Sequence, residues 1–212
     1  MDAARSSGRL PFSVVSRSEC LTFGRSPQIM EVILTPVAGV DVEQLPGEKD
    51  FDPWGGCLDA QSAWKNFGGL TLADAYAKFC DRPEIYQEDF MFMGCGAFHY
   101  YFPALEAYLR GITSSGDGDD CEAPIIGAAI EAQFDWRGAI ISAPLRDRIA
   151  ALCSFVLSHV ERFASSEADR RRIIESWSKL KHRLEAKESE ANKRLDRTRL
   201  DAARKSGSPP QA

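Results

Sequence analysis

The densest run of apolar and aromatic side chains lies between residues 85 and 112, with the sequence IYQEDFMFMGCGAFHYYFPALEAYLRGI. Beyond Gly96 the apolar positions recur every three or four residues, which is typical of one buried face of a helix. They are Phe98, Tyr101, Phe102, Leu105, Tyr108, Leu109 and Ile112. We therefore expect this segment to form the core, with Gly111 as the signal that ends the helix.

Pro103 falls inside this run and leaves two interpretations open, because proline lacks an N–H and clashes with the preceding helical turn. In the first, residues 98–102 form a short turn and Pro103 is the first position of a new helix. In the second, one helix bends at Pro103. We favour the first. Residues 87–93 are predicted to be one short helix, followed by a turn at residues 94–96.

Two late segments carry the clearest helical pattern. A stripe of apolar residues predicts a helix from Pro144 to about Ala164, with Pro144 at its first position after Ser142 or Ala143. Ser165 and Ser166 then begin a second helix, whose apolar seam runs through Ile173, Ile174, Trp177, Leu180 and Leu184. Beyond Leu184 charges dominate, so residues 185–205 are expected to project as a solvated helix.

The first half of the chain shows weaker signals. Residues 28–35 and 40–42 are strand candidates, and residues 45–56 have the composition of a loop that Phe51 and Trp54 would attach to the body. Short helices are expected at residues 60–67, after Thr71 with Asp74 in the first turn, and at residues 124–134.

Together these patterns predict a mainly α protein. A loosely ordered arm (residues 1–27) precedes a single helical domain (28–184) that includes a small N-terminal strand pair. A charged helical extension and a disordered tail (185–212) follow.

Charge divides the chain unevenly. The net charge is −5, yet residues 161–205 carry fourteen Lys or Arg and nine Asp or Glu, so an acidic body joins a basic helix. No apolar run is long enough to span a membrane, and the N-terminus lacks a signal-peptide core. A cytoplasmic location is therefore expected, where the six scattered cysteines would be buried or half-buried thiols.

The side chains best suited to acid–base chemistry are Glu88, Asp89, His99 and Tyr101. A carboxylate, an imidazole and a phenol could transfer protons if they met in a pocket. The structural interpretation is the stronger one, because acidic residues favour a helix N-terminus and tyrosines often bury their rings. We therefore name these four as a candidate pocket and assign no catalytic residue.

No other motif completes a site. Gly94-Cys95-Gly96 does not extend into a dinucleotide-binding fingerprint, and Asp117–Glu122 departs from a calcium loop at its fifth and sixth positions. The three histidines have no metal-binding spacing. No metal or cofactor is predicted.

Several positions in residues 60–112 resemble a family of small bacterial proteins of unknown function. The resemblance is carried by the order Trp64, Phe67, Thr71, Phe79, Glu88-Asp89 and then Phe98-x-Tyr100-Tyr101-x-Pro103-Ala104, because an aromatic-x-Tyr-Tyr-x-Pro-Ala segment near the middle is the mark of that family. It implies a bacterial, intracellular protein and no particular activity, ligand or site residue.

These observations favour a non-catalytic protein-binding or regulatory module over two alternatives. The alternatives are an enzyme that uses Glu88, Asp89, His99 and Tyr101, and a nucleic-acid-binding protein that uses the basic C-terminal helix. We expect a protein partner or self-association through that helix, and we expect neither a membrane nor nucleic acid as a partner.

Overall fold

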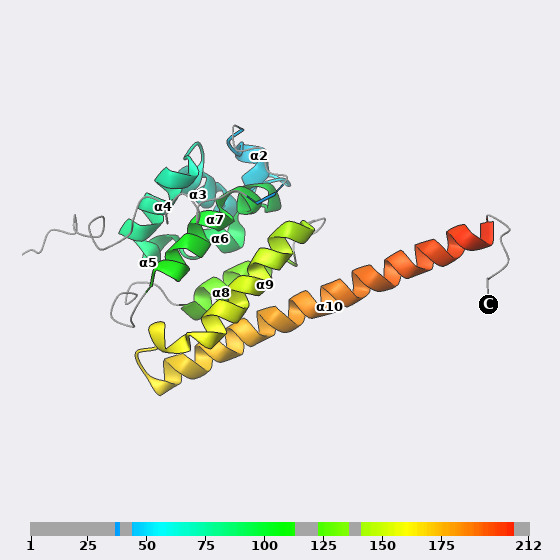
Figure 1. Ribbon diagram of the computed structural model, residues 1–212. Helices are drawn as coiled ribbons and strands as arrows, with labels where there is room; N and C mark the ends of the chain where they lie inside the picture. The colour runs from blue at the N-terminus through cyan, green and yellow to red at the C-terminus, as the bar shows by residue number, and fades with distance from the viewer. Residues whose placement is uncertain (1–36, 39–43, 113–122, 136–140, 206–212) are drawn as a thin grey trace, which may run out of the picture.

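The computed structural model describes residues 37–38, 44–112, 123–135 and 141–205, and throughout these ranges the regular structure is helical (Figure 1). The α-helices are α2 (Glu48–Phe51), α3 (Leu58–Phe67), α4 (Leu72–Asp81), α5 (Pro83–Tyr86), α6 (Asp89–Phe92), α7 (Cys95–Gly111), α8 (Ala123–Ala132), α9 (Ala143–Ser158) and α10 (Glu167–Lys205). A short 3-10 helix, η2 (Val160–Arg162), follows α9. The predicted mainly α class is confirmed, whereas the strand candidates at 28–35 and 40–42 lie outside the described residues.

Helix α7 is the centre of the molecule, as the dense apolar run predicts. It packs against α2 and α4 on one side and against α9 on the other. Its aromatic side chains Phe98, Tyr101 and Phe102 are fully buried. Helices α8, α9 and the first half of α10 form a second group, which α6 and α7 join to the first (Figure 1).

The favoured interpretation of Pro103 is wrong, because α7 is one helix that continues through this residue. Proline cannot donate the backbone hydrogen bond of a helix interior, which disfavours but does not forbid this position. Pro103 is buried, and so are nearly all side chains around it on α7. Tertiary packing around the aromatic residues therefore outweighs the local preference for a break.

Three predicted helix starts are confirmed by their side-chain caps. The Thr71 hydroxyl accepts the Asp74 N–H, and the Ser166 hydroxyl accepts the Asp169 N–H, both at 3.2 Å. The Ser142 hydroxyl accepts the Leu145 N–H at 3.4 Å, with Pro144 in the first turn of α9. Each cap satisfies one of the free donors that begin a helix.

Other predicted boundaries need correction. Residues 87–93 do not form one helix, since α5 ends at Tyr86 and α6 begins at Asp89. Residues 94–96 are not a turn, because Gly94 caps α7 and Cys95 already belongs to that helix. Gly94 lies so close to α2 that a Cβ atom there would be 2.4 Å from the Asp50 carbonyl oxygen. A contact between distant segments thus fixes where α7 starts.

The helix predicted at residues 144–164 is shorter than expected, because α9 ends at Ser158 and η2 replaces its last turn. The N–H of the C-terminal capping residue, His159, is shared between the carbonyls of Phe155 and Val156. This bifurcated bond tightens the chain toward 3-10 geometry. The change of geometry turns the chain so that α10 can return along α9.

Helix α10 has two parts. Residues 167–184 pack on α8 and α9 through Ile173, Trp177, Leu180 and Leu184, all buried. The helix then continues without interruption to Lys205, roughly 30 Å past Leu184 at 1.5 Å per residue, and projects from the body (Figure 1). The predicted projecting C-terminal helix is confirmed. In the described part of the chain, no helix combines the length and apolarity needed to cross a membrane.

Candidate functional site

The Tyr101 hydroxyl serves the connection between α3 and α4. It donates to the carbonyl oxygens of Phe67 at 2.7 Å and Leu70 at 3.0 Å, and the whole residue is buried. Burial raises the pKa of this phenol, with a smaller contribution from Tyr100. The hydroxyl proton is therefore shared between two carbonyls of the α3–α4 connection and stabilises the fold there.

His99 joins α7 to the start of α9. Its Nε2 atom accepts the Ser142 N–H at 3.1 Å, so the ring proton must be on Nδ1, which lies 2.8 Å from the Cys95 carbonyl oxygen. Burial lowers the pKa of this imidazole. Both ring nitrogens of the neutral side chain are therefore occupied by backbone groups.

The Cys95 thiol also lies near His99, with Sγ 3.4 Å from Nδ1. Sequence reasoning missed this pair, although the spacing of four places both residues on one face of a helix. A cysteine beside a histidine can become a nucleophile when the imidazole accepts the thiol proton. Here Nδ1 is the protonated nitrogen, so it cannot act as that base.

Asp89 is a buried carboxylic acid with a shifted pKa. It is 8% exposed, and its Oδ2 accepts a hydrogen bond from Asn66 Nδ2 at 2.8 Å. Burial raises the pKa of the carboxyl to about 6, while Asn66 and Lys78 act in the opposite direction and Glu88 adds to the rise. A carboxyl that titrates near neutral pH is chemically suited to proton transfer.

The neighbours of Asp89 connect several helices to one another. Lys78 Nζ donates to the Asn66 carbonyl oxygen at the end of α3 and lies 4.9 Å from the centre of the Tyr86 ring. Gln133, the residue after α8, is fully buried, and its Nε2 donates to the carbonyls of Phe90 in α6 and of Met93, which caps α6. Asn66, Lys78 and Gln133 have no local sequence signal, because their partners lie on other elements.

Three of the four candidate residues are therefore committed to different contacts. Tyr101 serves the α3–α4 connection, His99 serves the start of α9, and Asp89 binds Asn66. Glu88 is exposed on the surface. The Tyr101 hydroxyl, both ring nitrogens of His99 and one carboxylate oxygen of Asp89 thus already bind groups of the folded framework.

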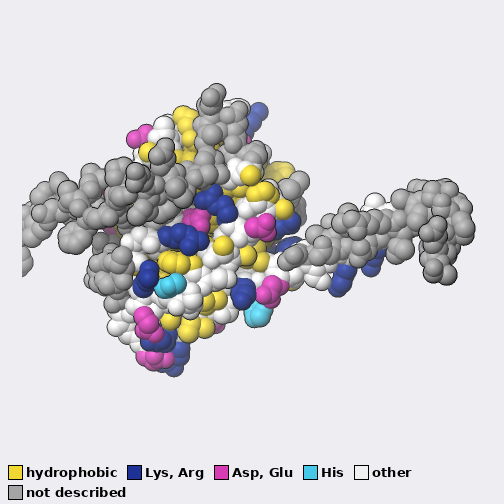
Figure 2. All heavy atoms as spheres, in the orientation of Figure 1, with side chains coloured by type: hydrophobic (Ala, Val, Ile, Leu, Met, Phe, Trp, Pro, Cys, Tyr) yellow, Lys and Arg dark blue, Asp and Glu magenta, His cyan; other side chains and the backbone are white. Residues whose placement is uncertain are grey.

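A second polar cluster links α7 to α9. Glu106 is 6% exposed and accepts hydrogen bonds from Arg110 Nε at 2.9 Å and from Arg148 Nε at 2.9 Å. The Arg110 guanidinium lies 4.8 Å from the centre of the Phe155 ring. On the face drawn in Figure 2, Lys and Arg side chains accordingly lie beside acidic and hydrophobic ones over α7 and α9. The spacing of four between Glu106 and Arg110 can be recognised in the sequence. The participation of Arg148 cannot, because it lies 42 residues from Glu106.

The remaining candidate groups are the cysteines and the side chains that could bind a metal ion. Cys57, Cys80 and Cys95 are half-buried and Cys153 is buried, in line with the expected burial of the thiols. Burial raises the pKa of Cys153 to about 12. Within the described ranges, no three His, Cys, Asp or Glu side chains gather closely enough to hold a metal ion. The acidic loop at residues 117–122 lies outside those ranges.

Comparisons of the chain with protein-family models, with curated proteins and with solved structures find no match. The assignment of function therefore depends on the contacts and surfaces described above.

Proposed function

We propose that this protein is a cytoplasmic, non-catalytic protein-binding module and that the projecting half of α10 is its binding element. The observation that carries the proposal is the uninterrupted continuation of α10 beyond the buried Leu184 to Lys205. Most helical stability in proteins comes from packing an apolar face, and a helix of about 20 residues is marginal alone. A partner would supply the packing that the body does not give.

The sequence of this projecting half has a face on which a partner could pack. Positions 184, 191 and 195 are separated by seven and four residues, so Leu184, Ala191 and Leu195 follow one side of the helix. An amphipathic helix that enters a groove is recognised through such spaced apolar positions. The buried Leu184 would make the partner's contact continuous with the core of the body.

The contacts of the candidate pocket also support a non-catalytic function. Tyr101, His99 and Asp89 each bind a different part of the framework, so an enzyme is the weaker proposal. Residues 185–205 mix seven basic and five acidic side chains. A nucleic-acid surface would carry a more uniform positive charge.

A matched pair of variants tests the proposal. Ala191→Glu places a charge on the apolar face, whereas Ser189→Glu adds the same side chain on the opposite, exposed face. Labelled full-length chains would be used to capture partners from a bacterial lysate, with mass spectrometry as the readout. We expect one specific partner to bind the parent chain and the Ser189→Glu variant and to be lost with Ala191→Glu.

Retention of that partner by both variants, or the absence of any specific partner, would contradict the proposal. Sedimentation velocity of the same proteins distinguishes self-association, which would appear as a dimer that Ala191→Glu dissociates. A gel shift that weakens steeply with salt and needs the basic residues of α10 would instead favour nucleic acid.

A further inference from the structure

The loop between α2 and α3 is held rigidly at both ends. Phe51, the last residue of α2, and Ala60, in the first turn of α3, are fully buried. Between them the Asp52 carboxylate accepts the N–H of Gly55 at 3.0 Å and of Cys57 at 3.1 Å. One buried carboxylate thus fixes the path of the backbone on either side of Gly56.

Two glycines make this path possible. Gly55 has a φ of 72° and Gly56 a φ of 87°, a region that residues with a Cβ atom rarely adopt. The loop therefore has a defined conformation that its sequence encodes. Such preorganisation reduces the conformational entropy lost when a loop binds a partner.

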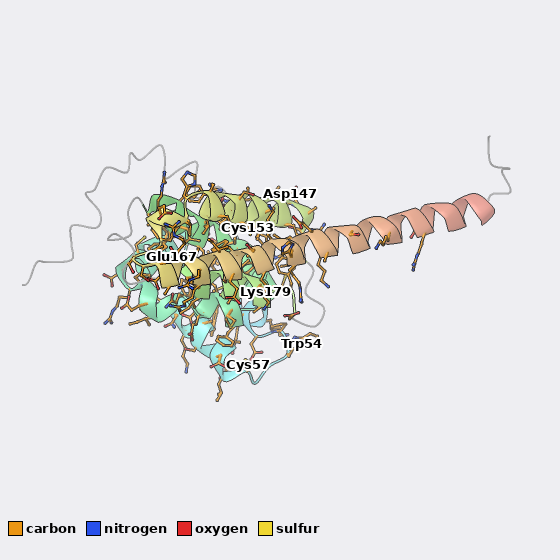
Figure 3. All side chains as sticks on the ribbon, turned by 90° about the horizontal axis from the view of Figure 1, so that it is seen from below. Trp54, Cys57, Asp147, Cys153, Glu167 and Lys179 are labelled. Atoms are coloured by element: carbon orange, nitrogen blue, oxygen red, sulfur yellow. The ribbon has the colours of Figure 1, made fainter. Side chains whose placement is uncertain are left out.

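The loop and the first residue of α3 present two large apolar side chains to solvent. Trp54 is 65% exposed and Leu58 is 79% exposed, so the expectation that Trp54 attaches the loop to the body is wrong. Phe51 alone provides that attachment, through ring contacts with Trp64 and Tyr101. Figure 3 shows Trp54 and Cys57 at the outer edge of the molecule.

Single exposed apolar residues are common on protein surfaces, but these two differ in kind. Tryptophan offers roughly 150–250 Å² of surface for burial and is the residue most enriched at binding hot spots. Here it is held outward by hydrogen bonds and by glycine geometry instead of lying loosely on the body. Leu58 adds a second apolar side chain four residues later.

The exposed charges beside the loop are mostly negative. Glu48, Asp50 and Asp59 are exposed and are opposed in this stretch by Lys49 alone. Complementary electrostatic potential at the rim of an interface speeds association and contributes to specificity for the partner. A matching surface should therefore combine an apolar pocket with Lys or Arg at its border.

We propose that Trp54 and Leu58 form a docking surface for a partner protein that has an apolar pocket bordered by basic side chains. We call residues 52–58 the Trp54 loop. The surface is separate from the projecting half of α10, and the proposal stands on different residues. The indole would enter the pocket, and the acidic residues beside the loop would meet the basic rim.

Site-specific photocrosslinking in the full chain tests this docking surface. A benzophenone amino acid replaces Leu58 in one protein and the exposed Ile85 of α5 in a control protein, and both are expressed in the native host. We expect a covalent product with one different protein from position 58 and none from position 85. The crosslinked partner peptide should be apolar and flanked by Lys or Arg.

Second-site changes identify the forces involved. Trp54→Ala should reduce the crosslinked yield about tenfold or more, since a tryptophan anchor dominates such interfaces. Asp59→Lys should reduce it by a smaller factor, and Ala191→Glu should leave it unchanged. Because Trp54 is exposed, circular dichroism should show an unaltered fold in Trp54→Ala.

Four results would overturn the proposal. The first is no product at position 58, and the second is a product that Trp54→Ala does not diminish. The third is a product formed with a second copy of this chain. Loss of the product in Ala191→Glu would also contradict it. Position 58 would then crosslink only because the α10 extension holds the partner nearby.

Discussion

The backbone N–H of Ser142 donates a hydrogen bond to Nε2 of His99, with 3.1 Å between the two nitrogen atoms. This bond connects the central helix α7 to the residue that caps α9. It exists only while His99 is neutral, because a protonated imidazole has no acceptor. Protonation of His99 therefore removes one of the contacts that join α7 to the start of α9.

Protonation of His99 should lower stability in acid. The pKa of the folded imidazole lies below its ordinary value of 6.5, so the unfolded chain binds the proton more tightly. The stabilisation from His99 is complete above about pH 6.5 and is lost as the pH falls below it. Urea unfolding at several pH values should show this loss in the parent chain and not in His99→Gln. The exposed His182→Gln is the matched control and should keep the parent's pH dependence.

Protonation of Asp89 should have the opposite effect and raise the stability of the folded chain. Its pKa rises from 3.8 to about 6 on folding, so the folded state binds the proton more tightly and stability falls as the pH rises through this interval. At 1.36 kcal/mol per pKa unit, the loss amounts to about 3 kcal/mol above pH 6. Asp89→Asn should remove this dependence and make the protein more stable than the parent at pH 8. A parent chain whose stability is flat between pH 4 and 6, once the His99 effect is subtracted, would refute the assignment.

Glu106 should be the acid whose removal destabilises most. Glu106→Ala leaves Arg110 and Arg148 without their shared carboxylate, and breaking a buried pair typically costs about 3–5 kcal/mol. Both arginines keep some contact with water, so we expect about 2–3 kcal/mol by urea denaturation. Glu161→Ala is the control, because its pair with Arg170 is exposed and should contribute less than about 1 kcal/mol. Equal losses in the two variants would contradict this ranking.

Gly127 should not tolerate a larger residue. A Cβ atom there would lie 2.6 Å from Ser176 Oγ and 3.1 Å from Trp177 Nε1, where α8 and α10 pack together. Gly127→Val should therefore destabilise by about 1–3 kcal/mol, despite the gain in helix propensity over glycine. In Gly127→Ala the obstacle is chiefly Ser176 Oγ, so adding Ser176→Ala should recover part of the loss. Thermal unfolding of the single and double variants measures this coupling.

How much the sequence predicts depends on how local each cause is. Thr71, Ser142 and Ser166 were predicted as helix starts because a cap needs only a side chain and a backbone N–H three residues later. The central position of α7 follows likewise from the density of its own apolar residues. Both signals lie within a single segment of chain.

The predictions that are wrong concern positions whose structure depends on other parts of the chain. Pro103 remains inside a helix because neighbouring helices bury it, and Trp54 points outward because Asp52 and two glycines direct the loop. The candidate site shows the same limit. Residue types identified Asp89, His99 and Tyr101, but their partners Asn66, Ser142 and Phe67 lie 23, 43 and 34 residues away in sequence. These partners become known only from the folded arrangement.

The unbroken course of α10 makes the projecting end a lever. Trp177 lies on the packed part of that helix and donates from Nε1 to the Ala123 carbonyl oxygen at 2.9 Å, at the start of α8. A sideways pull near Lys205 would be passed along this helix to its packed part, where Trp177 is the fluorescent side chain. Occupancy at the far tip should thus be readable in the body as a change in the fluorescence of one tryptophan.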